Sequence, residues 1–281
     1  MSQNTNPLRK YFRQPAIYIR LPSGGKYWIP GSVNMPENGE LPVLPMTAID
    51  EITYRTPDAL FNGQATVSVI QSCIPNIKDA WSMPGCDLNS ILIAIRVASY
   101  GHEMDLSSTC PKCATTSDYA VDLRQFLDQI VMPDYNQTSK ISDLEFVLKP
   151  ITYKDQNAVS LSNFENQKTL QQITQSENMD EKEKMARMAG IMQNATKLSL
   201  QTIAASVAAI RSPEGLVTER EHIQEFFAEC DINLYGSVRD KVIELRNQTE
   251  PKPLNITCKD CDHTYTQPIN FEMSNFFGTA S

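Results

Sequence analysis

The sequence predicts an α+β fold. In it, a small N-terminal β-hairpin region and short helices pack on a ribbon that is split between two distant parts of the chain. Two Cys-x-x-Cys pairs, Cys110/Cys113 and Cys258/Cys261, each lie between short segments that alternate as β-strands do. Between the two pairs, apolar residues recur mostly at helical spacing, which predicts a long, mainly helical insertion.

The paired cysteines indicate a metal site. Two intervening residues let one tight turn present both sulfurs to the same ion, and two such knuckles supply the four thiolates of a tetrahedral Zn²⁺ site. Strands are expected on both sides of each knuckle, at residues 104–109, 118–123, 254–257 and 265–271. We therefore expect a split zinc ribbon with one structural Zn²⁺ per chain, bound by Cys110, Cys113, Cys258 and Cys261. Ordinary buried thiols and two short disulfides are the alternatives.

A four-thiolate site has no open coordination position for water, so the metal is expected to be structural. Closing the chain between Cys113 and Cys258 at its neck would stabilise the fold by about 4–5 kcal/mol, as comparable covalent cross-links do. His263 follows the second knuckle closely enough to replace a ligand or to donate to a thiolate. A surface strand residue is the alternative for His263.

The predicted organisation has four parts: a flexible tail (1–15), an N-terminal β/α region with the first knuckle (16–130), a mainly helical insertion (131–250), and the second knuckle with a C-terminal tail (251–281).

The N-terminal region is predicted to open with a hairpin. Residues 16–21 form its first strand, Ser23-Gly24-Gly25 its turn and residues 26–29 its return strand. The aromatic side chains of this hairpin are candidate partner-binding residues, and burial inside the protein is the alternative for them: Tyr18, Tyr27 and Trp28.

Short helices should follow the hairpin. Thr47 can cap a helix that carries Asp50 in its first turn, and a helical turn starts at Pro57 and stops at Asn62-Gly63. Further helices are predicted over residues 66–73 and from a cap at Asp87 to Tyr100.

The insertion is predicted to begin with strands at residues 144–148 and 150–153 and then to be helical to about Asn247. Asp180 caps a helix whose apolar positions continue as far as Val207 and Ile210. Thr218 and Glu221 have capping-box spacing, and a last helix spans about 234–246. The methionines at helical spacing, Met185, Met188 and Met192, fit core filler, and a partner-binding face is the alternative.

Composition argues against several function classes. The net charge of −8 opposes nucleic-acid binding through a basic face, and the one dense basic cluster, Arg9, Lys10 and Arg13, fits a solvated tail. The polar N-terminus lacks a secretory signal and no apolar run is long enough to span a bilayer, so we expect a soluble protein that stays in a reducing cytoplasm.

An enzymatic function is not expected. The chain has three histidines and no nucleophile-elbow, Walker or Rossmann pattern. Cys73, Cys86 and Cys230 lack paired spacing and fit buried small hydrophobes.

An ordered set of segments carries a family resemblance: Tyr18–Tyr27, Pro45–Glu51, Pro57–Gly63, Leu92–Arg96, Tyr100-Gly101 and Cys110–Cys113. Together they resemble the baseplate hub subunit and hub assembly family of T4-like contractile-tailed bacteriophages. The resemblance is densest over residues 17–130 and loose in the helical insertion and the C-terminal tail.

The resemblance implies a non-enzymatic viral tail protein, a structural component or assembly factor of the baseplate hub. Its partners would be other phage tail and baseplate hub proteins, with no nucleic acid and no membrane, and it could form an oligomer. It would be located in the virion baseplate, and in the host cytoplasm during assembly. A zinc-ribbon nucleic-acid-binding or regulatory protein and an assembly chaperone absent from the mature virion are the alternatives.

Overall fold

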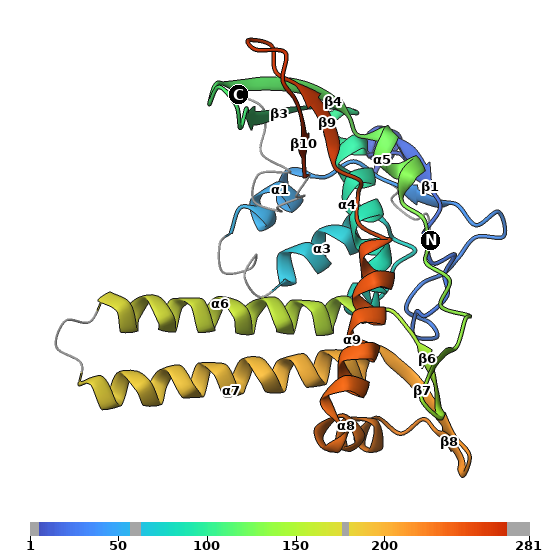
Figure 1. The fold of residues 1–281 in the computed structure, drawn as a ribbon. Coiled ribbons are helices and arrows are strands. Elements are labelled where there is room, and N and C mark those ends of the chain that lie inside the picture. The colour runs from blue at the N-terminus through green and yellow to red at the C-terminus, as the bar shows by residue number, and fades with distance from the viewer. Residues whose placement is uncertain (1–5, 57–62, 176–179, 269–281) are drawn as a thin grey trace. The chain divides into compact units, whose positions relative to one another are not determined.

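The structure is a computed structural model that describes residues 6–56, 63–175 and 180–268. Helices and small antiparallel sheets make up the described chain, which confirms the predicted α+β class (Figure 1). The chain divides into two compact units. The first comprises residues 1–80, 87–130 and 251–281, and the second comprises residues 81–86 and 131–250.

The first unit holds both cysteine-bearing hairpins and the helices near them. Its elements are η1 (Pro7–Tyr11), β1 (Ile17–Ile19), β2 (Leu41–Val43), α1 (Ala48–Tyr54), α3 (Gln64–Cys73), α4 (Gly85–Tyr100, from Asp87 on), β3 (Glu103–Thr109), β4 (Thr116–Asp122), α5 (Arg124–Gln129), β9 (Leu254–Thr257) and β10 (Thr264–Gln267). The predicted helical turn at residues 57–61 lies outside the described residues. Gly63, with φ 73°, is the N-cap of α3.

The predicted N-terminal hairpin is wrong in its second strand. β1 pairs with β2, with Ile17 opposite Val43, and residues 26–29 form turns instead. Left-handed backbone at Gly24, Gly25 and Tyr27 keeps this stretch from extending into a strand.

Asp87 explains why the turns around Ser23 and Trp28 are ordered. Its carboxylate accepts hydrogen bonds from the Ser23 backbone N–H at 2.8 Å, from Ser23 Oγ at 2.5 Å and from Trp28 Nε1 at 2.9 Å. Asp87 was predicted to cap α4. The helix begins at Gly85, so Asp87 lies in its first turn and holds the preceding loop.

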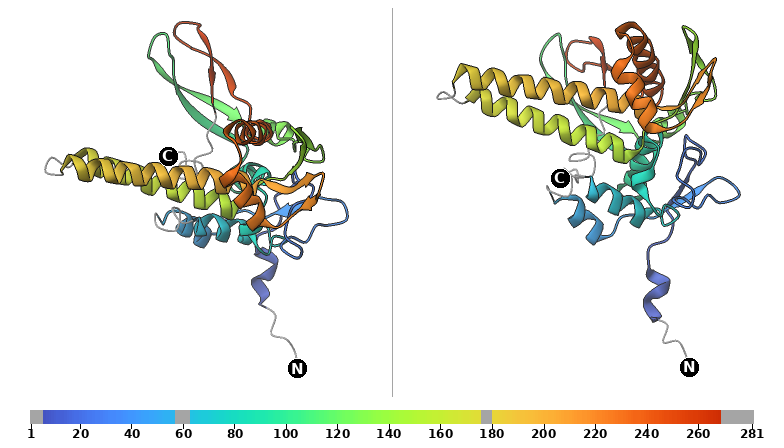
Figure 2. Two further views of the ribbon diagram at one scale, coloured as in Figure 1. Left: turned by 60° about the horizontal axis from the view of Figure 1, so that its bottom comes forward. Right: turned by 90° about the horizontal axis from the view of Figure 1, so that it is seen from below.

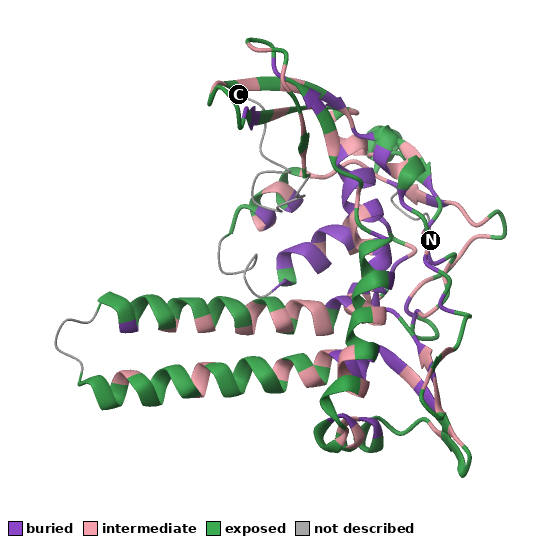
Figure 3. Cartoon of the chain, in the orientation of Figure 1, coloured by how far each residue is buried: buried purple, intermediate pink, exposed green. Residues whose placement is uncertain are grey.

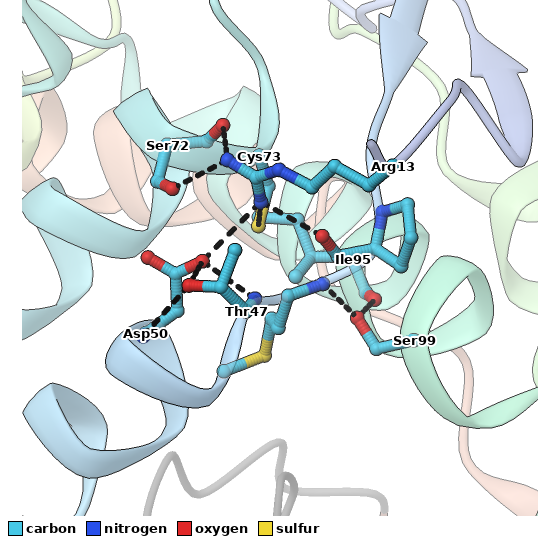
Figure 4. A network of polar contacts seen from close by, with 9 residues as sticks. Arg13, Thr47, Asp50, Ser72, Cys73, Ile95 and Ser99 are labelled. Carbon is cyan, nitrogen blue, oxygen red and sulfur yellow. Dashed lines mark hydrogen bonds and ion pairs between the residues drawn. The ribbon is translucent and has the colours of Figure 1, made fainter. Parts of the chain in front are cut away.

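Thr47 and Asp50 form the predicted cap of α1, and this prediction is confirmed as a complete capping box. Arg13 reaches the same carboxylate (Figure 4): its Nη1 lies 3.3 Å from Asp50 Oδ2, and its Nη2 donates to the Ser72 carbonyl and hydroxyl at 2.8 Å. Arg13 is therefore a partly buried anchor for the N-terminal segment, although the basic cluster that includes it was predicted to be a solvated tail.

The core of the first unit surrounds α3 and α4, which Figure 3 shows as largely buried. Residues Ile91 to Arg96 of α4 are buried all round the helix, as expected for a central core helix. The helix stops at Gly101, which has a φ of 87°, as predicted.

In its described residues, the second unit combines a four-stranded antiparallel sheet, in the order β5-β6-β7-β8, with four helices and a short 3₁₀ helix at its start. Its elements are η2 (Ala80–Ser82, from Trp81 on), β5 (Ser139–Ile141), β6 (Leu144–Leu148), α6 (Tyr153–Gln175), α7 (Glu181–Ala205), β7 (Val207–Ser212), β8 (Gly215–Val217), α8 (Arg220–Glu229) and α9 (Ile232–Asn247). Phe146 of β6 lies at 6.4 Å from Phe227 of α8, ring centre to ring centre, and both are buried. This aromatic contact joins the sheet to α8.

Three predictions in the insertion need correction. α7 ends at Ala205, and the residues predicted to continue it as a helix, Val207 and Ile210, lie in β7 instead. The predicted strand at 150–153 is reduced to one bridge at Thr152 before α6 begins. Thr218 does not cap α8, because Glu219 is the N-cap residue. The strand at 144–148 is confirmed, and the last helix is confirmed as α9.

α6 and α7 form a long antiparallel pair (Figure 2). In the part of the chain that the structure describes, none of the helices combines the length and apolar character that a membrane span requires.

Candidate metal centre

Each cysteine pair lies at the turn of a β-hairpin. β3 pairs with β4 so that Thr109 faces Thr116, and β9 pairs with β10 so that Thr257 faces Thr264. Six residues connect the two strands in both hairpins, with a cysteine at the first and the fourth of them. The two turns are therefore equivalent, although 145 residues separate Cys113 from Cys258 in the chain.

The backbone of the two knuckles is the same. In the first, the Cys110 N–H donates to the Thr115 carbonyl at 3.0 Å and the Ala114 N–H donates to the Cys110 carbonyl at 2.9 Å. The residue after the second cysteine, Ala114, has a φ of 58°.

The second knuckle repeats each feature. The Cys258 N–H donates to the His263 carbonyl at 2.9 Å, and the Asp262 N–H donates to the Cys258 carbonyl at 3.1 Å. Asp262 has a φ of 53°, matching Ala114. Such a turn exposes backbone N–H groups toward the sulfurs and stabilises their negative charge.

The four sulfur atoms come together. Cys110 Sγ lies 3.7 Å from Cys261 Sγ, and Cys113 Sγ lies 3.5 Å from Cys258 Sγ. All four ligand atoms lie within 4.8 Å of one another. A regular tetrahedron with metal–sulfur bonds of about 2.3 Å separates its sulfurs by about 3.8 Å. The cluster therefore has the size of a four-thiolate metal site and could hold a metal ion.

The protonation of the cluster is uneven. Hydrogen bonds from the Thr115 backbone and side chain, followed by those from neighbouring thiols, lower the pKa of Cys113 to about 6. The backbone N–H of His263 lowers the pKa of Cys261, but desolvation and the adjoining thiols outweigh it and raise that pKa to about 12. The Cys113 thiol therefore loses its proton readily, and the negative charge of one thiolate makes ionisation of the next thiol less favourable. A bound dication would offset this repulsion between thiolates.

Side-chain contacts join the two hairpins outside the cluster. Ser108 Oγ donates to Gln267 Oε1 at 2.7 Å and lies 2.9 Å from Tyr265 OH. On the other hairpin, Lys259 Nζ donates to the Asp118 carbonyl at 2.6 Å and lies 5.0 Å from the centre of the Tyr119 ring. These contacts were not predictable from the sequence, because their partners lie 140 to 159 residues apart and leave no local pattern.

The other predicted site residues lie outside the cysteine cluster. His263 does not belong to the cluster of close ligand atoms, and its ring stacks on Tyr265 at 6.3 Å. Tyr18 is 61% exposed, Tyr27 is half-buried, and Trp28 is buried at 8% exposure against Asp87. Burial, the alternative left open for these aromatic residues, thus applies to Trp28.

The three remaining cysteines lie apart from the cluster. Cys73 and Cys86 are buried, as predicted, whereas Cys230 is only partly buried. Burial of Cys73, with the nearby Asp50 carboxylate as a second cause, raises the pKa of its thiol to about 12, so this thiol stays protonated.

Comparisons with known proteins bear on the identity of the chain. The family described as T4 bacteriophage base plate protein matches residues 46–278, a region that includes all four clustered cysteines and the whole second unit from Val131 to Glu250. The match extends well beyond the densest part of the resemblance noted in the sequence, and it begins after the segment that contains Tyr18. Neither curated proteins nor solved structures give a significant match. The chain therefore belongs to the T4 bacteriophage base plate protein family.

Proposed function

We propose that this protein is a non-enzymatic structural component of the baseplate hub of a contractile phage tail. In this proposal it binds other tail proteins through surfaces held in place by one structural zinc ion. Membership of the base plate family supports a tail component. The observation that carries the zinc role is the gathering of four thiols, from Cys110 to Cys261, within 4.8 Å.

Zinc is the metal that this donor set favours. Four soft thiolates in a tetrahedral arrangement suit Zn²⁺, and equivalent knuckles on two hairpins are typical of structural zinc sites. Cys110 and Cys258, the first cysteine of each knuckle, are buried at 1% exposure, so the ion would be partly shielded from water. With four protein ligands the ion would have no place for a substrate, which supports a structural role.

The ion would add a shared ligand set to the side-chain contacts that join the two hairpins, such as Ser108 with Gln267 and Lys259 with Asp118. β3–β4 and β9–β10 are separate two-stranded sheets, and isolated two-stranded hairpins are marginally stable in water. A rigid first unit is useful to a tail protein, because partners must be held at fixed relative positions. This is the physical reason for proposing that zinc supports binding without taking part in it.

Tyr18 is the residue of the proposed partner surface that the structure leaves most accessible. It lies on β1, whose only paired neighbour among the described strands is β2, so one edge of β1 is not paired within the sheet. An exposed tyrosine on an unpaired strand edge can supply both an aromatic contact and backbone hydrogen bonds to a partner. Tyr27 is a secondary candidate, and Trp28 would support the loop from inside.

Mass spectrometry of purified phage particles tests the proposed role. Detection of this protein at a fixed stoichiometry with other hub proteins is expected, whereas its absence from finished particles would favour the assembly-chaperone alternative. Affinity purification from infected cells should recover tail proteins with the wild type and less of them with Tyr18→Ala. Tyr11→Ala is the matched control, since Tyr11 is 73% exposed and lies outside the proposed surface.

A further inference from the structure

α7 presents a stripe of exposed methionines that its own unit does not cover. Met185, Met188 and Met192 are 70%, 44% and 68% exposed. Their spacing places them on one side of the helix, on average about a quarter of a turn from the half-buried Ile191. The prediction that these methionines fill a core is therefore wrong.

The stripe leads into a groove between α7 and α8. This groove has a volume of about 480 Å³ and its lining includes Met192, Thr196 and Leu200 of α7 and Gln224 and Ala228 of α8. Met192 belongs to both features, so stripe and groove form one continuous surface within the second unit. Figure 3 shows the end of α7 that carries Met185 as mostly exposed.

We propose that this surface binds a second copy of the same chain, with the two α7 helices packed antiparallel across a two-fold axis. An axis between Met192 and Gln193 places Met185 of each copy opposite Leu200 of the other. The methionine stripe of one copy then fills the groove of its partner, and the reverse holds by symmetry. The methionine stripe and the groove lie at equal distances on either side of the axis. The surface is therefore complementary to itself, as a two-fold interface requires.

Charge supports this arrangement. α7 carries Lys182, Lys184, Arg187 and Lys197 against Glu181 and Glu183, a net charge of +2. α8 carries Arg220 against Glu221, Glu225 and Glu229, a net charge of −2 with His222 neutral. The two-fold axis places residues 184–193 of one α7 beside the groove of the other copy and its acidic α8. These residues include Lys184 and Arg187 and no acidic side chain, so opposite charges meet at the rim.

The available area is also sufficient. Residues 181–202 of α7, before its buried end at Ile203 to Ala205, span about 33 Å. A strip of this length and about two helix diameters wide, ~20 Å, covers about 660 Å² per copy. The pair of copies would then bury about 1,300 Å², at the lower end of the range for stable interfaces. Flexible methionine side chains pack well at such helix contacts.

The test is the mass of the full chain in solution, measured by light scattering during size-exclusion chromatography at about 100 μM. Interfaces of this size have dissociation constants in the micromolar range or tighter, so a dimer should dominate. The double variant Met185→Glu/Met192→Glu should be monomeric. Asn194→Glu adds one negative charge, against two in the double variant, on the opposite side of α7 at an exposed position, and should remain dimeric. Circular dichroism and thermal unfolding would establish that all variants are folded.

A second measurement checks the direction of packing. In a mixture of unlabelled and ¹⁵N-labelled protein, amine cross-linking should join Lys184 of one copy to Lys197 of the other. A monomeric wild type, a dimer that survives the double substitution, or cross-links that join Lys184 to Lys184 would each overturn the proposal. None of these results bears on zinc binding or on the presence of the protein in phage particles, so this inference can fail while the proposed function stands.

Discussion

The sulfur of Cys110 lies 3.7 Å from the sulfur of Cys261, although 151 residues separate the two cysteines in the chain. Residues 131–250, the larger part of the second unit, lie within that interval. An ion bound between the two knuckles would therefore close a very long loop of the unfolded chain, and closing a loop of this length stabilises the folded state. The stability of the first unit should depend on the metal.

Metal removal is the first prediction. Purified protein should contain one zinc per chain by elemental analysis, and Cys110→Ser/Cys258→Ser should lose it. We expect the free energy of unfolding to fall by about 4–5 kcal/mol or more, since the loop is no longer closed and the hairpins lose their shared ligand set. Denaturant unfolding with and without a chelator measures this change.

Two control substitutions test whether zinc binding depends specifically on the four clustered cysteines. Cys230→Ser changes a partly buried cysteine outside the cluster and should keep the zinc. His263→Ala should also keep it, because His263 is not among the close ligand atoms. Loss of zinc from either variant, or retention by the double serine variant, would contradict the proposed ligand set.

Each cysteine knuckle was predictable because the Cys-x-x-Cys spacing is a local sequence pattern. The spacing of Cys110 and Cys113, and the alternation around them, specify a knuckle without knowledge of the rest of the fold. The pairing of β1 was not predictable in this way. A turn at Ser23-Gly24-Gly25 favours a local hairpin, but the buried Asp87 carboxylate, 64 residues from Ser23, holds that turn in another conformation.

The prediction that the helix continues through Val207 and Ile210 was wrong for a different reason. Val207 and Ile210 continue the helical spacing of the preceding residues, and they also suit a buried strand. The pairing of β7 with both β6 and β8 decides between the two, and that pairing depends on residues up to 66 positions away. Short apolar runs are ambiguous for this reason, whereas α9, a longer periodic segment, was predicted closely.

Asp87→Ala should destabilise the first unit by about 3 kcal/mol or more. Removal of the carboxylate leaves three buried donors, two on Ser23 and one on Trp28, without this acceptor. Because the chain has two tryptophans, Trp81→Phe provides a background in which emission reports on Trp28 alone. We expect a red-shifted emission and a lower denaturation midpoint. Asp105→Ala, at an exposed position on β3, should change the free energy by less than about 0.5 kcal/mol. An equal effect of both substitutions would show that Asp87 does not order the loop.

Asp50→Ala should cost about 2 kcal/mol of unfolding free energy. Its Oδ2 accepts from the Thr47 N–H and hydroxyl, each at 2.7 Å, and receives Arg13 at 3.3 Å. Glu51→Ala is the control, because Glu51 forms an exposed pair with Arg55 at 2.7 Å, and such pairs contribute about 0.5 kcal/mol or less. Thermal unfolding of the two variants compares the costs, and a larger loss for Glu51→Ala would refute the anchoring role of Asp50.

Acid titration tests the pairing of Asp122 with Arg124. The Arg124 side chain, with Nη2 at 2.6 Å, and then its backbone N–H lower the pKa of Asp122 from 3.8 to about 2. A carboxyl group whose pKa is lower in the folded state adds stability above its unfolded pKa and loses it as the pH falls. The contribution should therefore be complete above about pH 4 and disappear toward pH 2, and Asp122→Asn should show a shallower loss of stability across that window. Carboxyl NMR should show a titration midpoint near 2 for Asp122 in the wild type and a higher one in Arg124→Met. An unchanged midpoint in Arg124→Met would mean that another group lowers this pKa.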